Sequence, residues 1–270
     1  MNFSVLLSAY KKEKPEYLKR ALKSIYVEQT LKPTEIVLVE DGKLTDELDK
    51  VILDFQNEVG DILKIVKIEV NQGLANALTV GLEHCSYELV ARMDTDDIAL
   101  PQRFEKQIAF MKENPDISVC GSFLGEFDDT SEEIKQIVKL PITHEETLKF
   151  LQLRTPIAHP VAMMRKSAIY EVGGYPPFPI GQDIALWSVL LARGYKLANI
   201  PEVLLKIRVN DNFYSRRSWE AFKSTIKVSK LQYAEGLIDR KTFIRNIIAR
   251  FFLRMSPVIL RKIAYKLLRK

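Results

Sequence analysis

Short apolar runs recur along the first half of the chain. They occupy residues 3–8, 35–39, 63–70, 88–92 and 117–123, and several of their side chains are β-branched. Strands that are buried on both faces of a sheet have this continuous apolar character. Each run therefore predicts a buried strand.

Amphipathic stretches separate these runs and begin at Pro15, Asn71 and Pro101. Each stretch carries apolar residues at helical spacing: Leu18, Leu22 and Ile25; Leu74, Ala77, Leu78 and Leu82; Phe104, Ile108 and Met111. Proline suits the first turn of a helix, and Asn71 is predicted to cap the second helix. Repeated strand–helix–strand units predict a parallel sheet with helices on both faces.

The pattern is less regular after about residue 130. Thr143, followed three positions later by Glu146, predicts a capping box at the start of a helix over 143–153. Further segments are predicted as a strand (161–164), a loop (173–177), a helix (183–191) and one or two strands broken at Pro201 (196–208). Beyond about Tyr214 the chain is predicted to be helical, which places a boundary between residues 1–214 and 215–270.

Acidic residues follow two of the predicted strands. Asp94, Asp96 and Asp97 follow the fourth run, and Asp41 ends the second. Ligands of open α/β sheets bind at the carboxyl ends of strands, so these residues are expected to share one crevice. A hard divalent cation would relieve the repulsion between the packed carboxylates. The alternatives are a solvated acidic turn with Asp97 capping the next helix, and a plain turn at Asp41.

The order of the motifs resembles that of family 2 of the nucleotide-sugar glycosyltransferases, which have the GT-A fold. The resemblance covers about residues 3–210. It rests on the segments SVLLSAY (4–10), IVLVEDG (36–42), NQGLANA (71–77), ARMDTDD (91–97), PQRF (101–104) with Gln107, His159-Pro160, GGY (173–175) and QDIALW (182–187). It implies an α/β fold with a mixed, mainly parallel Rossmann-like sheet flanked by helices, followed by a C-terminal helical appendage.

The resemblance also implies a nucleotide site. Ala9, Tyr10 and Asp41 would hold the base, commonly uracil, and Asp94 with Thr95 would contact the ribose or the donor sugar. The donor would be a nucleoside diphosphate sugar, most often a UDP-sugar.

Two further aspartates receive chemical roles from the resemblance. Asp96 would ligate the Mn²⁺ or Mg²⁺ that binds the diphosphate, and Asp183 matches the general base of inverting members. A carboxylate within hydrogen-bond reach can take the proton of a sugar hydroxyl, and a metal stabilises the charge on the leaving diphosphate. The alternative for Asp183 is an N-cap of the helix that it begins, and both roles are compatible.

Three residues have two interpretations each, and a fourth has one. His159 is either an additional metal ligand or, as we favour, a hydrogen-bonded loop histidine. Trp187 belongs either to an acceptor pocket or to an apolar helix face. Arg208 either reaches a phosphate or is a surface residue at a strand end. Tyr175 is predicted in a flexible loop where acceptors would enter.

The chain departs from the family pattern at three positions. Gln182 stands where many relatives have Glu, and Ser8 and Lys11 stand where relatives often have Pro and Asn. The Gln-x-x-Arg-Trp motif of processive synthases is absent, which predicts the addition of one sugar per acceptor.

Composition excludes several classes of protein. The 270 residues are 47% hydrophobic and 28% charged, which indicates a globular protein and not a disordered one. The longest stretch without Asp, Glu, Lys or Arg is 13 residues (70–82), whereas a spanning helix needs roughly 18 apolar residues. The first residues lack the pattern of a secretory signal, and two cysteines make no disulfide framework, so a cytoplasmic location is expected.

The net charge of +5 is unevenly distributed. Residues 239–270 carry ten Lys or Arg and one acid, a balance of +9, which leaves −4 for residues 1–238. Apolar residues alternate with these cations, and Pro257 is predicted to divide the segment into two helices. This pattern favours helices lying on an anionic membrane. The alternative is a helical pair packed on the body, and no nucleic-acid motif is present.

These observations predict an inverting, metal-dependent glycosyltransferase at the inner face of the cell membrane. It would move one sugar from a UDP-sugar to a saccharide acceptor linked to a lipid pyrophosphate, in the synthesis of a bacterial capsule, exopolysaccharide or O-antigen. One rival is a sugar nucleotidyltransferase, whose Gly-rich phosphate loop has no counterpart in residues 8–15. The other is a peripheral membrane adapter without catalytic activity.

Overall fold

The computed structural model describes residues 1–209 and 219–255. Its centre is a nine-stranded sheet with the order β3-β2-β1-β4-β8-β6-β9-β5, and β7 pairs with β6 beside this path. The strands are β1 (Phe3–Ala9), β2 (Glu35–Asp41), β3 (Leu63–Ile68), β4 (Leu89–Arg92), β5 (Ile98–Ala99), β6 (Ile117–Asp128), β7 (Ser131–Val138), β8 (Met163–Arg165) and β9 (Lys196–Arg208).

The sheet is mixed, and its longest pairings are parallel. Strands β3, β2, β1 and β4 run parallel to one another, with Ser8 of β1 opposite Val39 of β2. Strand β8 is antiparallel to both β4 and β6, whereas β6 and β9 are parallel. The predicted strands and the mixed, mainly parallel sheet are thus confirmed, but β3 lies at the end of the strand order and is only partly buried, so its predicted burial on both faces is wrong. The short antiparallel β8 joins the two parallel groups.

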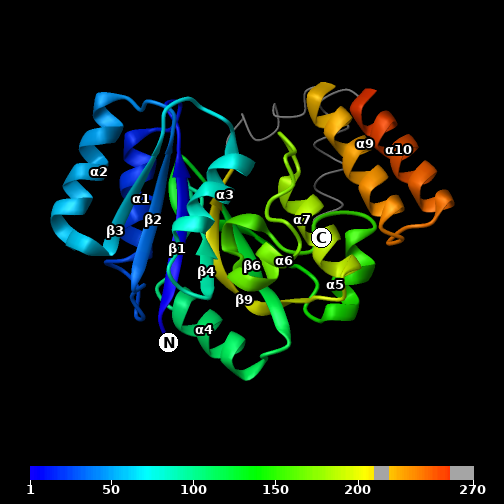
Figure 1. Cartoon of the computed structure of the whole chain (residues 1–270), viewed down its shortest axis with the longest axis horizontal. Coiled ribbons are helices and arrows are strands. Elements are labelled where there is room, and N and C mark those ends of the chain that lie inside the picture. The colour runs from blue at the N-terminus through cyan, green and yellow to red at the C-terminus, as the bar shows by residue number, and fades with distance from the viewer. Residues whose placement is uncertain (210–218, 256–270) are drawn as a thin grey trace.

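Helices cover both faces of the sheet (Figure 1). They are α1 (Pro15–Ile25), α2 (Asp46–Val59), α3 (Leu74–His84), α4 (Arg103–Glu113), α5 (His144–Leu151), α6 (Lys166–Glu171), α7 (Gln182–Ala192), α9 (Trp219–Ala234) and α10 (Arg240–Met255), with short 3₁₀ turns at Gly60–Ile62 and His159–Val161. Side chains of α1, α2 and α4 share one apolar core, and those of α3, α6 and α7 share the other.

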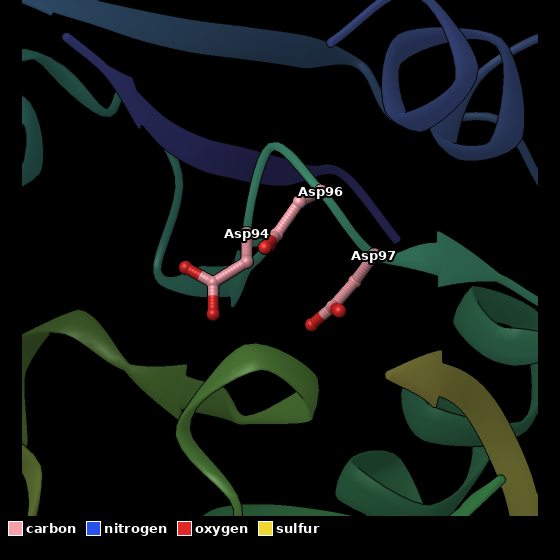
Figure 2. Close-up of side chains that lie close together, drawn as sticks. All are labelled: Asp94, Asp96 and Asp97. Carbon is pink, nitrogen blue, oxygen red and sulfur yellow. The ribbon is translucent and has the colours of Figure 1, made fainter. Parts of the chain in front are cut away.

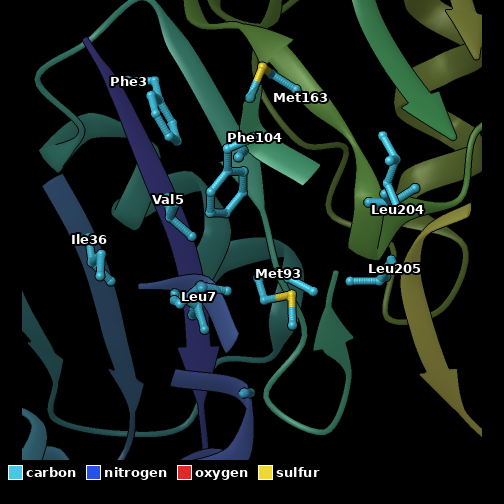
Figure 3. Close-up of a cluster of buried hydrophobic side chains, with 14 of the residues drawn as sticks. Phe3, Val5, Leu7, Ile36, Met93, Phe104, Met163, Leu204 and Leu205 are labelled. Carbon is cyan, nitrogen blue, oxygen red and sulfur yellow. The ribbon is translucent and has the colours of Figure 1, made fainter. Parts of the chain in front are cut away.

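Strand β1 shows why its sequence is apolar at nearly every position. Phe3, Val5 and Leu7 point into the core that contains α1, α2 and α4, as Figure 3 shows. Leu6 points into the opposite core. Alternate residues of a strand face opposite sides of a sheet, so a strand covered on both sides needs apolar residues on both.

The structure corrects some of the predicted helix ends. Asn71 does not cap α3, because Gly73 stands at that N-cap position with φ +87°. Asp97 does not cap α4, which begins at Arg103 after a Gln102 N-cap, two residues later than the predicted start at Pro101. The capping box between Thr143 and Glu146 is confirmed. Strand β9 continues through Pro201, where its register with β6 shifts.

The helices α9 and α10 form a pair that packs against α7 through α9 (Figure 1). Gln232 Nε2 donates to the carbonyl of Leu151 (3.4 Å), and Asn246 Nδ2 donates to the carbonyl of Gln152 (2.7 Å). The predicted boundary at Tyr214 and the predicted helix break at Pro257 lie outside the described residues. Among the described helices, none is long and apolar enough to cross a membrane.

Candidate active site

A cleft of about 770 Å³ opens at the carboxyl ends of β1, β2 and β4. Five residues that the sequence assigns to nucleotide or metal binding line it together: Tyr10, Asp41, Asp94, Thr95 and Asp96. Ala9 is fully buried in β1 and does not line the cleft. The predicted convergence of distant strand ends therefore occurs, and it follows from the parallel direction of β1, β2 and β4.

Asp41 organises one wall of this cleft. Its Oδ2 accepts hydrogen bonds from Asn71 Nδ2 (2.8 Å) and the backbone N–H of Gly73 (2.9 Å), and its Oδ1 accepts from the N–H of Gln72 (2.8 Å). The Asp41 side chain thus fixes the turn before α3, and this explains the role of the Asn-Gln-Gly segment. Since each carboxylate oxygen can accept about two hydrogen bonds, Oδ1 retains room for one more donor.

Three carboxylates lie together in the loop after β4. One oxygen from each of Asp94, Asp96 and Asp97 falls within 4.8 Å of the others, and Figure 2 shows the three side chains projecting from this one loop. The three offer only hard oxygen ligands, and an oxygen donor set suits Mg²⁺ or Mn²⁺. The residues present therefore fit the divalent cation that the sequence predicts. His159 is not a member of this group.

Asp97 is the buried member of the group. Burial, with the neighbouring charges of Asp96 and Asp94, raises the pKa of the Asp97 carboxyl well above its usual 3.8. Within the described residues, the Asp97 side chain accepts one hydrogen bond, from the backbone N–H of Arg208 to Asp97 Oδ1 (2.9 Å). A cation beside these aspartates would offset the cost of keeping them ionised.

Arg208, at the end of β9, contacts the loop after β4 that carries Asp94, Asp96 and Asp97, which we call the acidic loop. Its Nε donates to the carbonyl of Asp96 (3.0 Å), and its guanidinium pairs with Asp129 (2.7 Å). The guanidinium also stacks on the rings of Tyr17 (3.8 Å) and Phe127 (4.5 Å). These contacts hold the loop in place, a role that differs from both interpretations of the sequence, a phosphate ligand and a plain surface arginine.

Two buried arginines beside the acidic loop were assigned no role from the sequence. Arg92 is 2% exposed and forms an ion pair with Asp94, while its Nε and Nη1 have no partner among the described residues. Arg103 donates from Nη1 to Met93 Sδ (3.1 Å), and another of its amino groups bonds the carbonyl of Arg92 (2.5 Å). Arg103 thus anchors the strand end from which the aspartates project. Its position in the PQRF segment is the signal that could have identified it.

A second cleft, of about 550 Å³, adjoins the first and contains Asp183. Leu74 and Asp94 line both clefts, so the acidic loop lies between them. Asp183 stands in the first turn of α7, and burial raises the pKa of its carboxyl above 3.8 against the lowering effect of backbone hydrogen bonds and Arg92. A carboxylate with a raised pKa is a stronger base than an ordinary aspartate once it is ionised.

Three aromatic side chains pack together at the wall of this second cleft. His159, which lines the cleft, shares a hydrogen bond with the hydroxyl of Tyr175 (3.1 Å) and lies edge-on to the ring of Trp187. Burial and the charge of Arg92 hold the pKa of His159 well below 6.5, so its imidazole is neutral. These contacts agree with the interpretation of His159 as a hydrogen-bonded loop residue.

Tyr175 and Trp187 do not lie where they were predicted as acceptor contacts. Tyr175 is 5% exposed and packs in the core with α3 and α7, so it is not part of a flexible entry loop. Trp187 is fully buried, and its Nε1 donates to the carbonyl of Ile157 (3.1 Å). Its position agrees with the alternative of an apolar helix face. Both side chains position the cleft wall and do not line the cleft.

A mixed α/β sheet with clustered carboxylates at its strand ends and two adjoining clefts fits a transferase that acts on a nucleotide-linked substrate. The family model "Glycosyl transferase family 2" matches residues 4–173, and the chain belongs to this family of glycosyltransferases. It is 38% identical to the amylovoran biosynthesis glycosyltransferase AmsE of Erwinia amylovora, over 99% of both chains. It is 37% identical to the UDP-Gal:α-D-GlcNAc-diphosphoundecaprenol β-1,3-galactosyltransferase of Escherichia coli, over 98% of this chain and 95% of the relative.

Solved structures share the fold at low sequence identity. One is residues 1–349 of TarS from S. aureus in complex with UDP-GlcNAc, with a TM-score of 0.68, 17% identity and coverage of 94% of this chain and 72% of the other. Another is the mannosyltransferase PcManGT from Pyrobaculum calidifontis with GDP-Man and Mn²⁺, with a TM-score of 0.67, 16% identity and coverage of 94% and 70%. The GT-A-type fold expected from the sequence is thus confirmed.

Proposed function

We propose that the protein transfers one sugar from a UDP-sugar to a saccharide acceptor, with inversion at the anomeric carbon. The observation that carries this proposal is the placement of the acidic loop between two clefts, with Asp94 lining both. The larger cleft has the size and the polar wall of a nucleotide site. The smaller cleft presents Asp183, which would act as the base, on the far side of the same loop.

The donor would lie in the larger cleft with its diphosphate at the acidic loop. Asp96, with Asp94 and Asp97, would hold a Mn²⁺ or Mg²⁺ ion. When bound, the ion supplies positive charge to the diphosphate oxygens. The unused acceptor position on Asp41 Oδ1 would receive an N–H of the base. Two solved relatives of the fold contain UDP-GlcNAc in one case and GDP-Man with Mn²⁺ in the other, which supports this arrangement.

Asp183 would take the proton of the attacking hydroxyl. As the acceptor oxygen bonds to the anomeric carbon, the bond from that carbon to the diphosphate breaks, and its electron pair leaves with UDP. The proton passes from the acceptor hydroxyl to the Asp183 carboxylate, so no covalent enzyme intermediate is needed. Arg92 keeps Asp94 paired beside this reaction centre.

The acceptor would be a saccharide linked to a lipid pyrophosphate, used in bacterial surface polysaccharide synthesis. The E. coli relative is named for such an acceptor and the E. amylovora relative for amylovoran synthesis, and both align with nearly the whole chain. The basic C-terminal segment would bring the enzyme to the anionic inner face of the cell membrane. Residues 1–214 would supply the transferase fold, and 215–270 the membrane-facing helices.

Calorimetry with UDP tests the donor site. We expect UDP to bind in the presence of Mn²⁺, and Asp96→Ala to weaken this binding strongly. Asp54→Ala, which removes an exposed acid on α2, serves as the matched control and should bind as the wild type does. Failure of the wild type to bind UDP with Mn²⁺ would refute the assignment of the donor.

Transfer assays test the base. Asp183→Asn keeps the size of the side chain and should abolish transfer while UDP binding persists. Turnover of a UDP-sugar by the wild type would exclude the inactive adapter. Full activity of Asp183→Asn in a folded protein would remove Asp183 from the mechanism.

A further inference from the structure

Arg92, the last residue of β4, has a side chain whose hydrogen-bond donors are only partly satisfied. It is 2% exposed, and its ion pair within the described residues joins it to Asp94. Its Nε and Nη1 atoms are buried and have no hydrogen-bond partner within residues 1–209 and 219–255. N–H donors that are removed from water without a partner cost free energy, so such groups are normally satisfied by water or by a ligand.

The direction of β4 takes this side chain to the cleft that contains Asp183. Alternate residues of a strand point to the same face of a sheet, and Val90 packs in the core that contains α3, α6 and α7. Arg92 therefore points to the face on which α7 presents Asp183, and it lines the cleft of about 550 Å³ beside that residue. His144 and Asn199, the other described residues with an unpartnered buried side-chain atom, line neither cleft.

The polar groups around Arg92 already have partners of their own. The hydroxyl of Tyr175 shares a hydrogen bond with His159 Nε2 (3.1 Å), and the carboxylate of Asp94 pairs with Arg92 through Nη2. Within the described part of the chain, none of these groups accepts from Nε or Nη1 of Arg92. Oxygen atoms of a molecule in the cleft, water or substrate, are thus left as partners for these two donors.

The ion pair with Asp94 indicates which part of a substrate Arg92 meets. Asp94 lines both clefts, so it stands where the nucleotide cleft adjoins the Asp183 cleft. In the proposed function the diphosphate lies at the acidic loop, and the transferred sugar is the next group, between that loop and Asp183. A guanidinium has donors and no acceptor, so it would bind oxygen atoms of that sugar.

We propose that Arg92 binds an oxygen of the transferred sugar through Nε or Nη1 and thereby contributes to the choice of donor. This inference rests on the proposed function, because it takes the ligand to be a UDP-sugar with its diphosphate at the acidic loop. The guanidinium is planar, so the ion pair with Asp94 also fixes the direction of the two remaining donors. Such a contact would hold the anomeric carbon in place for attack by a hydroxyl beside Asp183.

Calorimetric titrations of the full chain in the presence of Mn²⁺ test this contact. The probes are UDP, UDP-galactose, UDP-glucose, UDP-N-acetylglucosamine and UDP-glucuronic acid. The UDP-sugar that binds most tightly is then compared with analogues that each lack one oxygen-bearing substituent of the sugar. Because UDP has no sugar, its Kd reports effects through the fold or the acidic loop. The ratio of the UDP-sugar Kd to the UDP Kd therefore isolates the contact with the sugar.

The variant is Arg92→Lys, which keeps a cation beside Asp94 but removes the planar group with its further donors. We expect it to raise the Kd ratio about tenfold or more, because a hydrogen bond from a charged group is lost. One analogue should bind the wild type about tenfold more weakly than the parent donor does, whereas Arg92→Lys should bind the two equally. Arg193→Lys makes the same change at an exposed position after α7 and should behave as the wild type does.

Two outcomes would overturn this inference alone. Arg92→Lys could weaken the binding of UDP and of the UDP-sugar by the same factor, which would assign Arg92 to the phosphates or to the fold. In the wild type, whose titrations depend on no variant, every analogue could bind as tightly as its parent, which would show that no sugar oxygen is held by a buried donor. Failure of the wild type to bind UDP or any of these UDP-sugars would instead refute the proposed function, and this inference with it.

Discussion

Replacement of Asp41 by asparagine tests whether the nucleotide cleft depends on its carboxylate. In the wild type, both oxygens of this 3% exposed side chain accept hydrogen bonds from the turn at residues 71–73. Asparagine keeps one carbonyl oxygen and presents an NH₂ group at the other position. Whichever way the amide lies, its NH₂ group faces at least one N–H donor of the turn.

The magnitude follows from the best orientation of the new side chain. With its oxygen at the position of the former Oδ2, the substituted side chain would still accept from Asn71 and Gly73, and only the N–H of Gln72 would lose its partner. One hydrogen bond to a charged group contributes about 1.5–3 kcal/mol. We therefore expect Asp41→Asn to lower the free energy of unfolding by about 2 kcal/mol, or Tm by about 4–8 °C.

Urea denaturation and calorimetric UDP binding measure the two consequences. The turn at residues 71–73 lines the nucleotide cleft, so weaker UDP binding should accompany the loss of stability. Asp54→Asn makes the same chemical change on the exposed surface of α2 and should stay within about 0.5 kcal/mol of the wild type. A change of that small size for Asp41→Asn would show that the three hydrogen bonds do not hold the cleft wall.

Three further predictions concern buried or partly buried groups. In the proposed mechanism kcat/KM requires ionised Asp183, so it should fall on acidification with a midpoint above 3.8, and a midpoint at or below 3.8 would contradict the raised pKa. Burial raises the pKa of Glu35, but hydrogen bonds from two serines outweigh this effect and lower the pKa below 4.5. Glu35→Gln should therefore lower the free energy of unfolding above pH 4.5. In urea denaturation at decreasing pH, the difference between this variant and the wild type should disappear as the pH falls through the lowered pKa. Gly81→Ala should lower the free energy of unfolding by about 1–3 kcal/mol, measured in urea, since its Cβ would lie 2.4 Å from Leu6 and 2.7 Å from Val39.

The parts of the fold with a strong apolar pattern could be predicted from the sequence. Strands β1, β2 and β4 are buried on both faces, so their positions follow from continuous apolar runs. Strand β7 was not predicted, because it pairs only with β6 among the described strands, most of its side chains are exposed, and its sequence has no continuous apolar run. Helix α2 was also not predicted, although Leu48, Ile52 and Phe55 repeat at helical spacing after a Thr45 cap.

The candidate site was predictable where the chemistry resides in the local sequence. Asp41 and the acidic loop after β4 stand at strand ends, so the direction of the sheet brings them together. The roles of Arg208 and Tyr175 were not predictable, because they depend on partners far away in the chain. Arg208 meets Asp129 only because β9 pairs with β6, and Tyr175 is buried because it packs with side chains of α3 and α7.

The position of α9 links the two halves of the proposed function. The helix contacts α7, whose first turn carries Asp183, and two of its serines line a cavity that adjoins the Asp183 cleft. Its partner α10 carries Ile244, Ile248 and Phe251 on one exposed face, at the spacing of a single helical stripe. In the proposed function, an acceptor with its lipid in a membrane would present its sugar to Asp183 from the side where that lipid lies. A helix pair that packs behind the wall of the Asp183 cleft and also carries the solvent-exposed apolar stripe is suited to align the sugar with the lipid.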